Sequence, residues 1–192
     1  VIMPMTINGS GTITGLSAGG LPDGSIQAAD FASGVGGKIL QVAAVSKTDT
    51  TSTDSTDWVD ITGMSVSMTP ASGTKILVNV NVNWGADVRW GMIRLLRDST
   101  AIAVGASPGS RVNVLFQCAG TDNVNNNEET MFNNSFMHLD THGANGSTAV
   151  TYKLQWAVSY SSGNTIYLNR SHNDSNSSFC ARGSSNIILQ EV

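Results

Sequence analysis

Apolar and polar residues alternate strictly between Thr74 and Trp84. Every second residue is apolar, and asparagine fills most of the positions between: the apolar residues are Ile76, Val78, Val80, Val82 and Trp84. A strand places all of these side chains on one face, whereas a helix would scatter them around its circumference. The pattern therefore predicts a half-buried β-strand.

The same two-residue period recurs along the rest of the chain. Further candidate strands are 38–46, 58–69, 88–97, 112–118, 131–140, 150–160, 165–170 and 185–192. Clusters of Gly, Asn, Asp, Ser and Pro separate them, and only residues 25–32, between Ser25 as a cap and Gly34 as a stop, suit a short helix. We therefore expect an all-β antiparallel β-sandwich or jelly roll of about eight or nine strands.

Two of these candidate strands carry apolar residues at both parities. In the candidate strand 88–97, Ile93 and Leu95 lie at one parity and Met92 and Leu96 at the other. The candidate strand 131–140 shows the same mixture. Either a β-bulge shifts the register of 88–97, or another subunit covers its second face. Since both strands show the mixture, we expect an oligomer. The predicted subunit-interface residues are Ile93, Leu95, Phe132 and Phe136, the last two opposite in parity to Met137 and Leu139.

The first 37 residues differ from the rest of the chain. They hold nine of the twenty glycines and only two charged residues, Asp23 and Asp30. Glycine buries no side chain and loses the most backbone entropy on ordering, so this stretch cannot build a core of its own. We expect an extended assembly arm at 1–36 and a β-sandwich domain at 37–192. The apolar residues that would grip a partner are Met5, Ile7, Ile13, Leu16, Leu21, Ile26 and Phe31.

Charge and hydropathy exclude some classes of binding partner. Only 12% of the residues are charged and the net charge is -4, so the chain has no basic stripe of the kind that binds nucleic acid. No apolar run approaches the length that crosses a bilayer, and no signal peptide is evident, so we expect a soluble protein without membrane insertion. Cys118 and Cys180 suit either a disulfide or two small buried side chains.

Several short motifs suggest chemistry, but their context argues against it. Ser17 lies in a G-x-S-x-G pattern, yet a nucleophile elbow needs a strand before it and a helix after it, and here it lies in the glycine-rich arm. His138, Asp140 and His142 have metal-ligand spacing, but the turn that follows would take His142 off the common face. The acidic stretch that includes Asp49, Asp54, Asp57 and Asp60 lacks EF-hand spacing. We predict no catalytic residues, no metal and no cofactor.

The aromatic residues are candidates either for the core or for a binding surface. Trp84, Trp156 and Tyr160 fall on the apolar parity of their strands, which favours the core over a sugar-stacking platform. Tyr167, Asn169, Arg170 and His172 form a polar and aromatic mixture that suits hydrogen bonding to a host-surface glycan. These four residues are the candidates for host-surface binding.

Several segments of the chain have a distinctive sequence. In the arm they are 3–16 (MPMTINGSGTITGL), 20–26 (GLPDGSI) and 37–42 (GKILQV). In the domain they are 74–78 (TKILV), 94–98 (RLLRD), 150–155 (VTYKLQ), 166–170 (IYLNR) and 185–192 (SNIILQEV). Together these segments resemble tail-fibre and appendage proteins of tailed bacteriophages, particularly those of aquatic and cyanobacterial hosts.

The resemblance covers most of the chain and implies a virion structural protein assembled in the host cytoplasm. It implies a homotrimeric β-sandwich or jelly-roll module, held to tail or baseplate proteins by its arm, that displays loops to the host surface. A capsid decoration protein that straps neighbouring head subunits uses the same architecture and is the alternative. A glycan-cleaving enzyme is the least supported reading, because the acids are scattered singly or massed in one loop instead of forming a pair.

Overall fold

The computed structural model describes residues 39–87, 90–106, 109–118, 129–159 and 164–192, together with the backbone of two short strands nearer the N-terminus. The chain divides into two compact units, Val1–Lys38 and Ile39–Val192. In the first unit, β1 (Thr6–Ile7) pairs with β2 (Ile13–Thr14) in antiparallel register. The predicted short helix and the side chains of the predicted arm residues lie outside the described residues.

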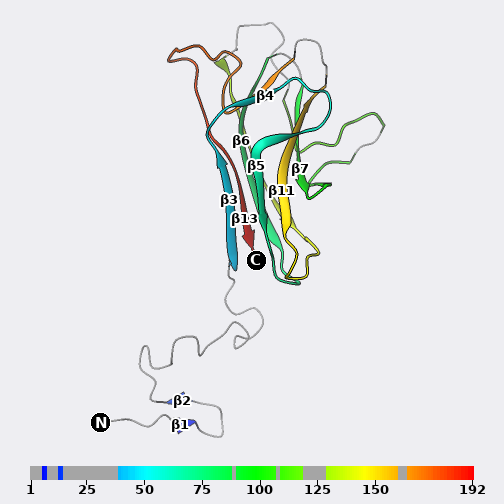
Figure 1. Cartoon of the computed structure of the whole chain (residues 1–192), viewed down its shortest axis with the longest axis vertical. Coiled ribbons are helices and arrows are strands. Elements are labelled where there is room, and N and C mark those ends of the chain that lie inside the picture. The colour runs from blue at the N-terminus through cyan, green and yellow to red at the C-terminus, as the bar shows by residue number, and fades with distance from the viewer. Residues whose placement is uncertain are drawn as a thin grey trace, which may run out of the picture. The chain divides into compact units, whose positions relative to one another are not determined.

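The second unit is an antiparallel β-sandwich (Figure 1). Sheet I contains β3 (Gln41–Lys47), β4 (Thr51–Thr53), β6 (Ile76–Ala86), β10 (Phe132–Asp140), β12 (Ile166–Leu168) and β13 (Ser185–Glu191). Sheet II contains β5 (Val59–Met68), β7 (Gly91–Arg97), β8 (Thr100–Ile102), β9 (Phe116–Cys118) and β11 (Val150–Val158). The all-β class is confirmed. Each of the nine predicted strands overlaps an observed strand, although 112–118 is a strand only over Phe116–Cys118, and β1, β2, β4 and β8 are additional. Within the described part of the chain, no helix has the length and hydropathy that crossing a bilayer requires.

The inward faces of the two sheets form one hydrophobic core. The apolar parity of β6 points inward, and Ile76, Val78, Val80, Val82 and Trp84 have no exposed surface. Trp156 and Tyr152 of β11 are buried against them from sheet II. The prediction that Trp84 and Trp156 belong to the core is confirmed, while Tyr160 lies outside the described residues.

A bulge interrupts β5 and changes which parity points inward. The pairing of β11 with β5 shifts between Lys153, opposite Ser65, and Gln155, opposite Asp60. Gly63 lies in the interrupted stretch with a φ of 83°, a left-handed conformation that glycine adopts without steric cost. As a result Ile61 and Met64 both point into the core, although they are three positions apart and an unbroken strand would place them on opposite faces.

The structure corrects the predicted role of β7. Ile93 and Leu95 have no exposed surface because they belong to the core of their own chain, so they cannot line a subunit interface. The pairing of β7 with β11 runs without a register shift, which also excludes a bulge in β7. Met92 and Leu96 point to the other side of the sheet, yet they are 7% and 4% exposed, so the chain itself covers both faces of this strand.

The parity of β10 is likewise opposite to the one predicted for the interface. Phe132 and Phe136 point inward and pack on the rim of the core, where their rings make edge contacts with Trp84 and Phe116 at centroid distances of 6.5 Å. Met137, on the other parity, points outward. Phe132 and Phe136 are half-buried at the rim of the core, so their place in an interface stays a prediction, and Met137 and Leu139 are the exposed apolar residues of this strand.

A buried polar network ties the two sheets together. Asp140 of sheet I accepts a hydrogen bond of 2.7 Å from the Tyr152 hydroxyl and two of 2.9 Å from the Arg97 guanidinium, and both donors belong to sheet II. Burial, followed by the bond to Asp140, raises the pKa of Tyr152, so this hydroxyl stays protonated and keeps donating. The network holds the two sheets in a fixed relative orientation, and their outward faces are fixed with them.

A second network fixes the edge strand β3. The carboxylate of Glu191, at the end of β13, is 2% exposed and accepts hydrogen bonds from the Gln41 amide, the Thr74 hydroxyl and the backbone N–H of Ala71 at 2.5 to 2.7 Å. Burial alone would raise the pKa of Glu191, but the bonds from Thr74, Gln41 and Ala71 outweigh it and leave that pKa below its ordinary value.

Candidate functional site

Four strands of sheet I, in the order β3, β13, β6 and β10, present their outward side chains in aligned rows. The registers place Ala44, Ile188, Asn79 and Met137 in one row, and the rows on either side follow the same strands. We call this outward surface the amide face. Its residues are Val42, Ala44, Ser46, Leu77, Asn79, Asn81, Asn83, Asn133, Ser135, Met137, Leu139, Asn186, Ile188 and Gln190.

The amide face carries no charged residue. One end is apolar, where Val42, Met137 and Leu139 are 58%, 64% and 49% exposed. The other end consists of asparagine and serine side chains. Isolated exposed apolar residues are normal on a protein surface, but several on one uncharged sheet face are typical of a contact surface.

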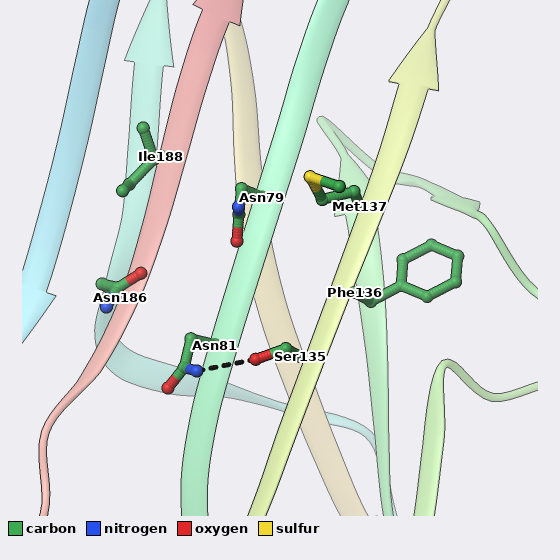
Figure 2. Close-up of a pocket in the computed structure, with 7 residues that line it drawn as sticks. All are labelled: Asn79, Asn81, Ser135, Phe136, Met137, Asn186 and Ile188. Carbon is green, nitrogen blue, oxygen red and sulfur yellow. Dashed lines mark hydrogen bonds between the residues drawn. The ribbon is translucent and has the colours of Figure 1, made fainter.

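A shallow groove of about 500 Å³ crosses this face between β13, β6 and β10. Figure 2 shows the residues that line it: Asn186 and Ile188 from β13, Asn79 and Asn81 from β6, and Ser135, Phe136 and Met137 from β10. The groove therefore joins the apolar end of the face to its amide end.

The amide groups of this face are only partly used within the chain. Asn81 donates to the Ser135 hydroxyl at 2.7 Å, and Asn133 donates to the Asn83 carbonyl oxygen at 2.9 Å. Among the described residues, the side chains of Asn79 and Asn186 make no hydrogen bond. Since an amide side chain both donates and accepts, two amide faces can hydrogen-bond to each other without any charged group.

The outward face of sheet II has a different character. Arg94 donates to the Gln155 carbonyl oxygen at 3.0 and 2.6 Å, and the Gln155 amide donates to Asp60 at 2.7 Å. Lys153 donates to the other oxygen of Asp60 at 2.8 Å. We call these four residues the polar ladder, which crosses β7, β11 and β5.

Trp58 supports one end of the polar ladder. The guanidinium carbon of Arg94 lies 4.3 Å from the centroid of its ring, which is cation–π geometry. Burial lowers the pKa of Arg94, and the bonds from Lys153 and then Gln155 lower the pKa of Asp60. Both charges persist at neutral pH, so the ladder is a fixed row of charged and amide groups.

The four residues predicted for host-surface binding do not all reach the surface. Asn169 has no exposed surface: its amide donates to the backbone oxygens of Lys47 and Asp49, and its carbonyl accepts from Ser185. Its φ of 60° and these bonds hold a turn together. The prediction that Asn169 contacts a host surface is therefore wrong.

The other three of these residues do come together. The Arg170 guanidinium lies 3.8 Å from the centroid of the Tyr167 ring, whose edge contacts His172 at 5.5 Å. Nδ1 of His172 lies 3.4 Å from a carboxylate oxygen of Asp87. Arg170 also donates to the backbone oxygens of Ser171 and His172, so its charge stabilises the loop that carries it.

The residues with metal-ligand spacing have other partners. Asp140 is engaged by Arg97 and Tyr152, while Nδ1 of His142 accepts from the backbone N–H of Ala144 at 2.8 Å. Within the described ranges, no group of three His, Cys, Asp or Glu side chains is arranged to hold a metal ion. Cys180 is a free thiol whose sulfur lies 3.3 Å from the Ser175 hydroxyl.

Sequence comparison adds no family to these observations. The chain matches no protein-family model, and no curated protein is similar to it in sequence. The two outward faces are therefore the features of this chain that bear on its function.

Sequence reasoning missed both of these faces. The polar parity of 74–84 was visible, but its position beside β13 and β10 depends on strand order, which no local pattern contains. For the polar ladder a local signal existed, because Lys153 and Gln155 occupy the polar parity of a strongly alternating strand.

Proposed function

We propose that this chain is a non-enzymatic structural protein of a tailed-phage virion, a homotrimeric tail-fibre or appendage module. In this proposal the arm at 1–36 attaches the module to tail or baseplate proteins, and the β-sandwich recognises the host surface. The observation that carries the proposal is the amide face, because a surface without charges and with exposed apolar residues favours contact with another copy of the chain. The sequence resemblance described above supports the virion context.

The size of the amide face is consistent with such a contact. Each outward residue of a sheet covers roughly 33 Å². This is the product of about 4.8 Å between neighbouring strands and about 6.8 Å between alternate residues of one strand. The whole face then covers roughly 460 Å², compared with roughly 800 Å² per partner in a standard interface. The amide face alone therefore has the area of a weak self-association, and the arm is left to contact other virion proteins.

Deletion of residues 1–36 tests the proposal. Because residues 39–192 form their own core, the truncated chain should fold. We expect it to remain an oligomer through the amide face and to be lost from purified particles, as measured by light scattering and by immunoblotting of virions. Normal incorporation of the truncated chain would contradict the assigned role of the arm.

Imaging of labelled particles separates the two virion roles. Label at the tail or baseplate supports the appendage, whereas label spread over the head supports the decoration protein and contradicts the appendage. Release of oligosaccharide from host polysaccharide by the purified protein would contradict a non-enzymatic role.

A further inference from the structure

The polar ladder is fixed in place before any ligand arrives. Each member is held by a neighbour on another strand, and Trp58 stacks on the guanidinium at one end. Side chains that are already ordered lose little conformational entropy when they bind a ligand. A row of this kind can therefore bind more strongly than the same residues on a mobile loop.

The exposed end of the polar ladder keeps unused hydrogen-bonding capacity. An ammonium group has three donors and a guanidinium has five N–H groups. Within the described part of the chain, Lys153 uses one donor and Arg94 uses two N–H groups, while each oxygen of Asp60 accepts one bond. The side chains of Asp60 and Lys153 are 52% and 26% exposed, so a ligand can reach this end of the ladder. Met92 and Leu96, on either side of Arg94, are instead covered by the chain.

An exposed aromatic residue lies at one end of the same sheet. Trp90 immediately precedes β7 and is 41% exposed, and its φ of 52° is rare for a residue with a large side chain. Gly91 pairs with Val158 and Val59 pairs with Trp156, so Trp90 and Trp58 lie on opposite sides of β11. Backbone strain of this kind is found more often at functional sites than elsewhere.

We propose that the polar ladder and Trp90 form a binding site for a neutral oligosaccharide built of hexose units. Hexose hydroxyls both donate and accept, which suits the alternation of Lys153, Asp60, Gln155 and Arg94, and the apolar face of a sugar ring packs on an exposed indole. At the exposed end of the ladder Lys153 donates to Asp60, so their opposite charges offset each other and this end gives a carboxylated sugar no free cation, which favours a neutral ligand. The assignment of this glycan to a host surface rests on the proposed function, whereas the site itself does not.

The test uses the full chain labelled with ¹⁵N at tryptophan, which gives one indole resonance for each of the four tryptophans. The probes are neutral trisaccharides of glucose, mannose and galactose, and trigalacturonate as an acidic probe, each at about 50 mM to detect millimolar affinities. We expect at least one neutral probe to shift the resonances of Trp58 and Trp90. The buried Trp84 and Trp156 should not shift, and they report that the fold is unchanged.

Two variants make the result specific to the polar ladder. Gln155→Ala removes its central member and should weaken binding about tenfold, whereas the matched Asn79→Ala change on the amide face should leave binding unchanged. Absence of shifts with every neutral probe, shifts with trigalacturonate alone, or equal affinity in Gln155→Ala would each overturn the proposal. Incorporation into particles is a separate readout, so failure of sugar binding can be distinguished from failure of the proposed function.

Discussion

The two outward faces of the sandwich are built from strands of similar length but carry opposite chemistry. The amide face has no charge and holds Val42, Met137 and Leu139 in solvent, whereas the face with the polar ladder holds three charged residues that are linked through hydrogen bonds to one another or to Gln155. Uncharged surface loses little when water is removed from it, and bonded charges lose much. The difference suggests that the amide face is covered by another copy of the chain while the polar ladder stays in contact with solvent and ligand.

The largest effect should come from breaking the link that holds both faces on one body. Asp140→Ala leaves the buried Tyr152 hydroxyl and the Arg97 guanidinium without their acceptor, which should cost about 3 kcal/mol or more of unfolding free energy. Urea denaturation measures it. Tyr152→Phe, which removes one donor and leaves Asp140 bonded to Arg97, should cost less, and an equal cost would show that the carboxylate is not the centre of the network.

If a charge on the amide face does not weaken association of the chains, the two faces do not differ as proposed. Met137→Lys places an ammonium on a side chain that is 64% exposed in the single chain, so folding should be little changed. Association should weaken by about 100-fold or more, because the charge would be buried between subunits. Sedimentation measures the change. Ser67→Lys on sheet II is the matched control and should leave association unchanged; equal effects would remove the distinction between the faces.

Glu191 supports the edge of the amide face, because it accepts a hydrogen bond from Gln41 at the start of β3. Glu191→Gln should cost about 1 to 2 kcal/mol at neutral pH, because an amide replaces one of two acceptor oxygens with a donor. The folded-state pKa of Glu191 is lowered, so its contribution is present above the unfolded pKa and disappears as the pH falls through the folded value. Denaturation at about pH 6 and pH 3 should show a smaller difference between these pH values in the variant than in the original chain.

The smallest effect should come from the polar ladder itself. Asp60→Asn removes two charge-assisted bonds, but this carboxylate is half exposed, so we expect a cost of only a few tenths of a kcal/mol. The pKa of Asp60 is lowered by Lys153 and then Gln155, so the contribution is present above the unfolded pKa and is lost in acid. A cost above about 2 kcal/mol in urea would show that the ladder serves stability more than binding.

Period-two alternation was enough to predict the strands because one face of each is buried. It missed β1, β2, β4 and β8, which are too short to show a period, whereas the equally short β9 and β12 were found only inside longer predicted segments. It also could not decide which parity of β10 points inward, since both carry large apolar residues. That choice depends on the partners of Phe132 and Phe136, which are Trp84 and Phe116 from distant parts of the chain.

The candidate faces depended even more on contacts between distant segments. Asp60 looked like one acid among several in a polar stretch, but it is a strand residue bonded to partners more than ninety positions away. Asn169 looked like a ligand-binding residue and instead holds three backbone segments together. In both cases the residue type indicated hydrogen bonding, and only the fold determined the partner.

The bulge at Gly63 has a consequence for how this protein can change over evolutionary time. It separates β5 into a segment that carries Asp60, directly after Trp58, and a segment that carries Ser65 and Ser67. An insertion in an unbroken strand would reverse the orientation of every residue beyond it, whereas the bulge can absorb added or lost residues locally. The ligand-facing end can therefore acquire new specificity while the remainder of the strand keeps its place in the hydrophobic interior.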